Sequence, residues 1–416
     1  MESLPLISAT MVSSAPAKDV TPEPNSNTIE WHSRRCTWGG PMSLHRVLCM
    51  QGGDDDGSYA KNSDATASAI TLSKPLLLNA IRSMKLFLTS KHDDSLRVAD
   101  LGCATGYNTL ATVNMVVEGL RKRYAEELGF EPEFEAFFSD LPSNDFNYLF
   151  RMLSGVVSAD CRQRYFAAGV PGSFYHRLFP RAKLHVAVSL SALHWLSQIP
   201  EEVTDKSSPA WNKGRAWIDG AKEEVVEAYA RRSEEDLDNF LRCRKEEIVE
   251  GGVLFMLMGG RPSSQQPCDQ LGDPDSRDKH PFTTSMDRAW QDLLDEGLID
   301  EETRDGFNIP AYMRSMEEVE RAMAKCGGFE IQRMEYRRIR EHSEEKQEEW
   351  ARDPASYGLS KANLVRATLG PIVEAHLGRS LSHELFDRFR RRVSAELGLL
   401  AKTRFYGVIV VCAIRK

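Results

Sequence analysis

The stretch from Asp100 to Asn108 is the first place where residue types and spacing suggest chemistry. It separates an apolar segment from one with helical spacing, and its small side chains let the backbone approach a ligand. The stretch does not match the G-x-G-x-x-G fingerprint, and the chain has no G-x-x-x-x-G-K-S/T phosphate loop. We therefore expect a ligand without phosphate groups, such as an adenosyl group that carries an amino acid.

A second acidic residue, Asp140, follows the next apolar segment along the chain. A carboxylate at this position can accept hydrogen bonds from both hydroxyl groups of a ribose. Without Asp140, the turn would also fit an ordinary connection between a strand and a helix. The two features together favour a nucleoside site.

The elements that position these residues follow from the hydrophobic pattern. The chain is expected to form helices over 67–89, 109–128 and 237–250, and strands over 96–101, 134–138, 184–190, 253–258 and 405–414. The order strand, turn, helix, strand is typical of a parallel sheet. The predicted fold class is therefore α/β, with a Rossmann-like sheet and an inserted α-helical cap.

Four regions are expected along the chain. Residues 1–40 are rich in Ser, Thr and Pro without an apolar signal core, which indicates a disordered tail. The range 41–260 should form the α/β domain, with a cap segment near 200–220, and 261–400 a mainly helical cap. Residues 401–416 should return to the sheet as the last strand. Ligand sites favour the boundary between such layers.

Composition excludes several classes of function. The net charge is −8, and the short basic cluster Arg388 to Arg392 is interpreted as a solvated helix face, so no nucleic-acid partner is expected. The eight cysteines are scattered without a C-x-x-C pair, which indicates a reduced, intracellular protein that we place in the cytoplasm. No run of 18 apolar residues exists, so no membrane partner is expected.

Several motifs together resemble the SABATH family of plant-type S-adenosylmethionine-dependent carboxyl and N-methyltransferases. They stand in family order from about residue 43 to the C-terminus. The motifs are Met50 with Gly52-Gly53, Ser58-Tyr59-Ala60, Asn62-Ser63, Asp100 to Cys103 with Gly106 and Asn108, Ser139 to Asn147, Val170 to Tyr175, Leu178 to Pro180, His194 to Ser197, Asn212 to Gly214, and Phe307 to Pro310. The fold that the resemblance implies is the class I methyltransferase sheet.

The resemblance implies a set of residues around S-adenosylmethionine. Asp140 suits the ribose, Leu141 and Phe174 suit the faces of the adenine, and Asn108 or Ser63 suits the amino-acid end. Without the family context, Leu141 and Phe174 would be read as core residues. The expected cofactor-binding residues are Tyr59, Ser63, Asp100, Cys103, Asn108, Asp140, Leu141, Ser173 and Phe174.

The expected acceptor of the methyl group is a carboxylate, and its protonation state decides whether the protein must supply a general base. A carboxylic acid with a pKa of about 4 is ionised at neutral pH and needs no general base. We therefore expect no catalytic acid or base, and a neutral donor such as the Trp195 indole at the acceptor. His194 is expected beside it, although it also fits a core histidine. Thr66 and Ser191 stand where relatives that use aromatic acids often have Gln and Tyr.

The resemblance also implies a magnesium site and a homodimer. The matching positions for the metal are Asn212, Asp305, the Phe307 carbonyl and Asn308, and oxygen ligands suit a hard cation. Asp305 can equally be an acidic turn residue before Gly306.

The resulting hypothesis is a methyltransferase that esterifies a small aromatic acid of the cinnamate, benzoate or salicylate type. Trp195, Phe174, Phe307 and Met258 supply the apolar surface for such an acid. Jasmonate-like and indole-3-acetate-like acids remain open, as does N-methylation of a purine-like alkaloid. An S-adenosylmethionine-binding protein without activity is the alternative from another class.

Overall fold

The parallel strands of one mixed sheet end along the same edge of that sheet. The computed structural model describes residues 44–87, 95–157, 165–264, 270, 281–396, 398–402 and 405–416. The tail expected over residues 1–40 lies outside the described residues. The described strands are β1 Ser95–Leu101, β2 Glu133–Asp140, β3 Phe166–Pro171, β4 Leu184–Leu190, β5 Ile248–Arg261, β6 Arg314–Ser315, β7 Phe329–Arg340 and β8 Phe405–Arg415.

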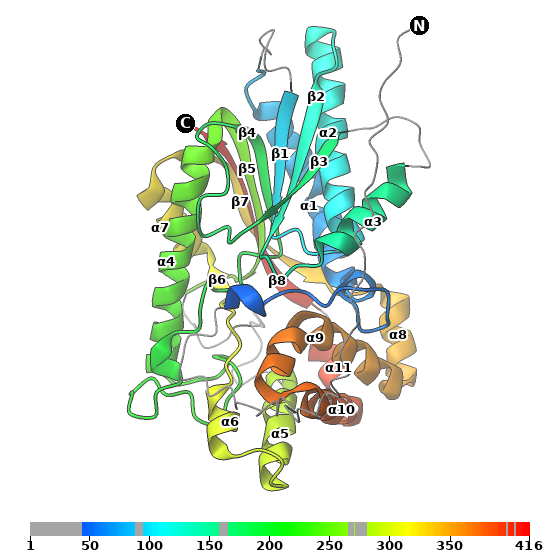
Figure 1. Cartoon of the computed structure of the whole chain (residues 1–416), viewed down its shortest axis with the longest axis vertical. Coiled ribbons are helices and arrows are strands. Elements are labelled where there is room, and N and C mark those ends of the chain that lie inside the picture. Colours follow the sequence, from blue (N-terminus) through cyan, green and yellow to red (C-terminus); the bar gives the residue numbers. More distant parts are fainter. Residues whose placement is uncertain are drawn as a thin grey trace, which may run out of the picture. The chain divides into compact units, whose positions relative to one another are not determined.

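The sheet runs in the order β3-β2-β1-β4-β5-β8-β7, and β6 pairs with the end of β5 (Figure 1). Strands β1 to β5 pair in parallel, whereas β8 is antiparallel to both β5 and β7. The chain order reverses between β1 and β4, which is where open α/β sheets bind their ligands. The predicted α/β fold is thereby confirmed.

Helices cover both faces of this sheet (Figure 1). Helices α1 and α2 pack on one face, and α4 and α7 pack on the other. The described helices are η1 Leu44–Arg46, η2 Tyr59–Lys61, α1 Asp64–Ser83, α2 Tyr107–Leu128, α3 Phe146–Val157, η3 Glu201–Val203, α4 Glu223–Glu247, α5 Pro281–Asp295, α6 Glu301–Gly306, α7 Met316–Cys326, α8 Glu344–Arg352, α9 Pro354–Leu377, α10 Arg379–Ala395 and α11 Leu399–Lys402. No described helix has the length and apolar character needed to cross a membrane.

The helical cap has a core of its own. Apolar side chains of α5, α8, α9 and α10 pack together with those of η1. The range 261–400, which we expected as the cap, also contains α7 and β7, and β7 lies in the sheet beside β8. Strand β7 was missed because only two of its residues, Phe329 and Ile339, are buried, so its apolar alternation is weak.

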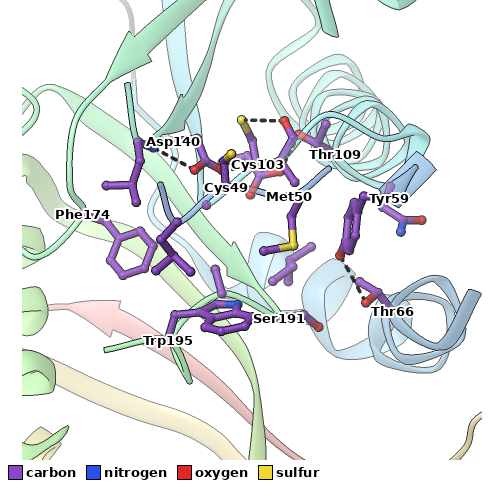
Figure 2. A pocket seen from close by; sticks show the side chains of 18 of the residues that line it. Cys49, Met50, Tyr59, Thr66, Cys103, Thr109, Asp140, Phe174, Ser191 and Trp195 are labelled. Atoms are coloured by element: carbon purple, nitrogen blue, oxygen red, sulfur yellow. Dashed lines mark hydrogen bonds between the residues drawn. The ribbon is translucent and has the colours of Figure 1, made fainter. Parts of the chain in front are cut away.

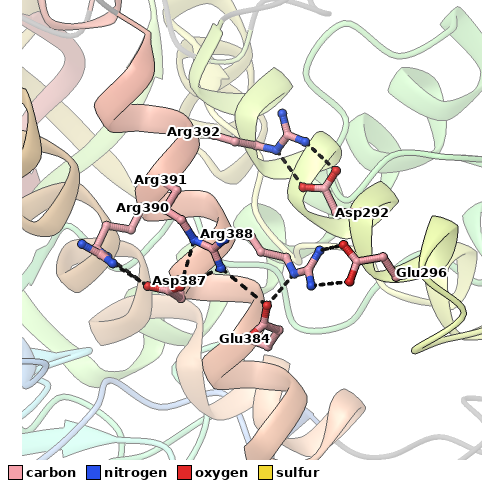
Figure 3. Close-up of polar contacts among 8 residues, drawn as sticks. All are labelled: Asp292, Glu296, Glu384, Asp387, Arg388, Arg390, Arg391 and Arg392. Atoms are coloured by element: carbon pink, nitrogen blue, oxygen red, sulfur yellow. Dashed lines mark hydrogen bonds and ion pairs between the residues drawn. The ribbon is translucent and has the colours of Figure 1, made fainter.

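The basic cluster at Arg388 to Arg392 lies on α10 and is neutralised within the cap (Figure 3). Arg388 binds both carboxylate oxygens of Glu296 at 2.6 and 2.7 Å, and Arg392 Nε donates to Asp292 at 2.9 Å. These ion pairs join α10 to α5 and the residue that follows it. Exposed pairs contribute only about 0–1 kcal/mol each to stability. The pairing agrees with a solvated helix face rather than a nucleic-acid site.

Candidate functional site

One cavity lies at the carboxyl ends of β1, β2 and β4, where η1, η2 and α1 also contribute to its wall (Figure 2). The residues at its wall come from six separate segments of the chain. Most of the predicted site residues line it, namely Tyr59, Thr66, Asp100, Cys103, Asn108, Asp140, Leu141, Ser173, Phe174, Ser191 and Trp195. Ser63 and His194 are not among the lining residues.

The turn after β1 requires a residue without a side chain. Gly102 has φ of +83°, which L-residues rarely adopt, and a Cβ there would overlap the Ala192 methyl group and approach the Phe174 ring to 3.3 Å. The Gly102 and Cys103 N–H groups donate to the Ser139 carbonyl at 2.8 and 3.0 Å. The turn is therefore packed tightly between β2 and the loop after β4.

Asp140 ends β2, and backbone donors hold its carboxylate. Its Oδ2 accepts from the Ala104 N–H and its Oδ1 from the Leu141 N–H, both at 2.7 Å. Each carboxylate oxygen can accept a further hydrogen bond, as a ribose would require. Burial raises the pKa of Asp140 to about 6, although the two backbone hydrogen bonds lower it.

Asp100 has a different environment at the end of β1. Its carboxylate is buried and accepts from the Thr109 hydroxyl at 2.6 Å. Burial raises its pKa to about 7, against the lowering effect of Thr109. Asp100 thus ties the turn to the first helical turn of α2. Sequence reasoning missed Thr109, although its place in that first turn, nine residues after an acid at a strand end, was a usable signal.

Asn108 and Ser63 are joined by hydrogen bonds. The Asn108 amide donates to the Ser63 hydroxyl at 3.0 Å and to its carbonyl at 3.3 Å. Asn108 lines the cavity, whereas Ser63 lies behind it as a hydrogen-bond partner. On the neighbouring wall the Tyr59 and Thr66 hydroxyls are 3.4 Å apart (Figure 2).

Phe174 and Leu141 both line the cavity and pack against the surrounding core. The Phe174 ring meets Tyr175 and Phe240 edge to face, with ring centres 4.7 and 5.9 Å apart. Leu141 packs against the core of the cap. Core packing and ligand contact are therefore compatible at these two positions.

The loop after β4 carries the expected acceptor residues. Ser191 has φ of +58°, an uncommon value for serine, and its N–H donates to the Leu257 carbonyl. Figure 2 shows the Trp195 indole lying along the cavity wall. His194 lies against Gly259, and burial together with the charge of Arg314 lowers its pKa to about 4. His194 is therefore neutral at neutral pH.

The charged residues described in the cavity wall are all acidic. Asp100 and Asp140 are its acidic residues, and no described arginine, lysine or histidine lines it. Such a wall suits a positively charged ligand near the acids. The hydrogen-bond donors of the rest of the wall are neutral side chains such as Trp195.

Several lining residues were not predicted from the sequence. Most of them have apolar or small side chains, which do not by themselves indicate a function. The main ones are Leu44, Leu48, Cys49, Met50, Ile70, Leu190, Ala192, Leu196 and Ser197. By contrast Phe307 and Met258, which we expected as surface for an aromatic acid, are buried and do not line this cavity. The Phe307 ring stacks on Trp290 instead, with centres 4.7 Å apart.

The four residues expected at a metal are close neighbours in the cap. The Asn212 amide donates to Asn308 Oδ1 at 2.7 Å, and Asp305 Oδ1 accepts from the Gly214 N–H at 2.8 Å. The Asn212 Oδ1 atom is buried and has no hydrogen-bond partner among the described residues. A buried oxygen without a hydrogen-bond partner among the described residues suits a hard cation.

The chain is similar to known proteins over nearly its whole length. Residues 45–416 match the model of a family described as SAM dependent carboxyl methyltransferase. Gibberellic acid methyltransferases 2 and 1 of Arabidopsis thaliana are 60% and 57% identical, over 90% of this chain and 96% and 98% of the relatives. A solved structure, "Loganic acid methyltransferase with SAH", is 32% identical with a TM-score of 0.75, covering 88% of this chain and 98% of that one.

The raised pKa of Asp140 predicts how cofactor affinity depends on pH. Ribose hydroxyls favour the ionised carboxylate, so the affinity for S-adenosylhomocysteine should fall as pH drops below about 6, by at most about tenfold per pH unit. Titration calorimetry between pH 5 and 8 measures this. Asp140→Asn should bind weakly at every pH. A wild-type affinity that stays constant down to pH 5 would contradict the role given to Asp140.

Proposed function

Because the chain belongs to the family of S-adenosylmethionine-dependent carboxyl methyltransferases, we propose that it methylates the carboxylate of a gibberellin-type acid. The single observation that carries the reaction type is a cavity wall with two carboxylates and no cationic residue among the described ones. The 60% and 57% identity to the two gibberellic acid methyltransferases supports the choice of acid.

The donor half of the cavity is the part formed by Asn108, Asp140, Leu141 and Phe174, and these residues contact different parts of the cofactor. When bound, S-adenosylmethionine supplies an activated methyl group on a positively charged sulfur. Asp140 accepts hydrogen bonds from the ribose, Leu141 and Phe174 enclose the adenine, and Asn108 binds the amino-acid end. Because position 102 is a glycine, the turn can pack closely against Ala192 and Phe174 at the edge of this half of the cavity.

The acceptor half of the cavity, formed by Thr66, Ser191 and Trp195, aligns the acid and does not activate it. The acid is already ionised, so no residue needs to remove a proton. Opposite charges cancel as the methyl group moves, so a strong ion pair to the carboxylate would favour the ground state over the transition state. The neutral Trp195 indole, which lines the cavity, would hold the carboxylate without such an ion pair. In-line placement of the carboxylate then provides most of the acceleration.

The rest of the cavity wall favours a bulky aliphatic acid over the aromatic acid that we expected from the sequence. Phe307 and Met258 do not contribute to the wall, while aliphatic side chains from η1, α1 and the loop after β4 do. The wall also carries the hydroxyl groups of Thr66, Ser191 and Ser197. Aliphatic surface with scattered hydroxyls suits a polycyclic, hydroxylated acid.

A panel assay tests the proposed acid. The purified protein is incubated with S-adenosylmethionine and, separately, gibberellic, indole-3-acetic, jasmonic, cinnamic, benzoic and salicylic acids and xanthines, and products are identified by mass spectrometry. Gibberellic acid should give a methyl ester with kcat/KM at least about tenfold above the others, which corresponds to about 1.4 kcal/mol. Faster turnover of an aromatic acid or a xanthine would contradict the proposal. Cofactor binding without any product would indicate a protein without activity.

Trp195→Phe tests the neutral donor, because it keeps an aromatic ring and removes the N–H group. Loss of the donor that orients the carboxylate should lower kcat by about 10²-fold, because the acid is no longer held in line with the methyl group. Binding of S-adenosylhomocysteine should stay within about twofold of wild type, because the donor half is unchanged. An unaltered kcat would show that the indole N–H does not contact the reacting carboxylate.

We propose that Mg²⁺ binds in the cap through oxygen atoms of Asn212, Asp305, Phe307 and Asn308. The cluster does not line the cavity, so the metal would stabilise the cap and take no part in the reaction. Added Mg²⁺ should raise the melting temperature of the wild type by mass action and should have little effect on Asp305→Asn. Equal shifts in the two proteins, or no shift in either, would refute this site.

A further inference from the structure

Helix α4 touches the loop after β4 at one of its buried charged residues. Asp236 on α4 accepts hydrogen bonds from the Ser197 N–H at 2.8 Å and from the Ser197 hydroxyl at 2.6 Å. Its side chain is 1% exposed. Ser197 and Trp195 both line the cavity, so this contact fixes the backbone two residues from the indole.

A second contact joins α4 to the same loop. The Arg314 guanidinium is buried and donates to the Leu193 carbonyl and, at 3.0 Å, to the Ser233 carbonyl of α4. The Tyr175 hydroxyl donates to the Trp195 carbonyl. The loop that carries Trp195 is therefore held through its backbone, and two of its contacts lead to α4.

The other end of α4 holds the loop after β3, which forms the adenine side of the cavity. Arg244 donates to the Phe174 carbonyl at 2.9 Å and to the His176 carbonyl at 3.0 Å. Glu247, paired with Arg244 at 2.8 Å, accepts from the N–H groups of Leu178 and Phe179 at 2.6 and 3.1 Å. Both charged side chains are 0% exposed.

The same helix also contacts the Phe174 ring. Phe240 meets that ring edge to face, and the Arg244 guanidinium lies over Phe240, 5.1 Å from the ring centre. Asp236 and Arg244 are eight residues apart, which corresponds to about 12 Å along a helix at 1.5 Å per residue. One rigid element thus sets the spacing between the two loops.

We propose that α4 aligns methyl donor and acceptor, with Arg244 as the positioning residue for the cofactor loop and Asp236 as the positioning residue for the acceptor loop. Neither side chain lines the cavity, so both act through the loops. A small displacement of either loop changes the in-line geometry on which the rate depends. The two residues should therefore affect different kinetic constants.

The test, which rests on the proposed carboxyl methylation, compares Asp236→Ala with Arg244→Lys. In Asp236→Ala the acid KM should rise and kcat should fall at least about tenfold, with S-adenosylhomocysteine affinity within twofold of wild type. Arg244→Lys supplies one nitrogen and cannot bridge both carbonyls, so S-adenosylhomocysteine affinity should fall about tenfold. Its acid KM at saturating S-adenosylmethionine should remain within about twofold.

Matched variants on the same helix act as controls. Asp238→Ala removes a carboxylate that pairs with the exposed Lys325, and Arg242→Lys alters an exposed arginine bonded to Asn239. Both should behave like wild type. Asp236→Asn should restore activity, because its amide oxygen accepts from the Ser197 N–H and its amide nitrogen donates to the Ser197 hydroxyl.

Equal losses of cofactor affinity and acid kinetics in both variants, or no loss in either, would overturn the proposal. If Asp236→Ala does not fold, Arg314→Lys replaces it, because one nitrogen cannot bridge the Leu193 and Ser233 carbonyls. This variant must also impair the acid kinetics and leave S-adenosylhomocysteine affinity within twofold of wild type. The acid used is whichever one the wild type esterifies in the panel. Failure on gibberellic acid alone therefore rejects the proposed substrate and leaves the positioning test intact.

Discussion

A positively charged methyl donor has to meet a negatively charged acceptor, and the charge of the cavity wall decides how well they react. The wall supplies carboxylates from Asp100 and Asp140 and, within the described residues, no basic side chain. The positive charge of the donor therefore has partners in the protein. We propose that the acceptor carboxylate is held by neutral donors, so that its negative charge stays available to the methyl group.

Burial of two carboxylates in this wall disfavours their ionised forms, and nearby hydrogen-bond donors partly compensate for this. Burial raises the pKa of Asp100 to about 7 and that of Asp140 to about 6, so both carboxylates ionise less readily than they would in water. The Thr109 hydroxyl bonds the first, and the N–H groups of Ala104 and Leu141 bond the second. The bound methyl donor, with its positive charge and ribose hydroxyls, would further stabilise the ionised carboxylates. The buried pair of Arg244 and Glu247 lies outside the cavity and holds the backbone of the loop after β3.

The sequence predicted the parts of the fold and the site that follow from local pattern. The strand over 184–190 was predicted with the bounds that the structure shows, and Asp140 was identified from its place after a strand. Strands β3 and β7 were missed because both lie at sheet edges and bury few residues. Helix α4 was predicted to begin at residue 237, whereas it begins at Glu223 in the structure. The Glu and Arg residues in its first half obscure the apolar pattern of its buried face. Ser63 and His194 illustrate another limit, since family motifs identify a neighbourhood and not which side chain faces the cavity. Contacts such as those of Asp236 and Arg244 join segments far apart in the sequence, and no local pattern could reveal them.

We propose that the acid is held by neutral groups, in line with the methyl donor, between two loops anchored on α4. A crystal structure of the protein with S-adenosylhomocysteine and the acid that it esterifies would show this arrangement. We expect a carboxylate oxygen that accepts a hydrogen bond from the Trp195 indole and faces the sulfur, with no arginine, lysine or protonated histidine in contact. A carboxylate paired with a cationic side chain, or turned away from the sulfur, would contradict it.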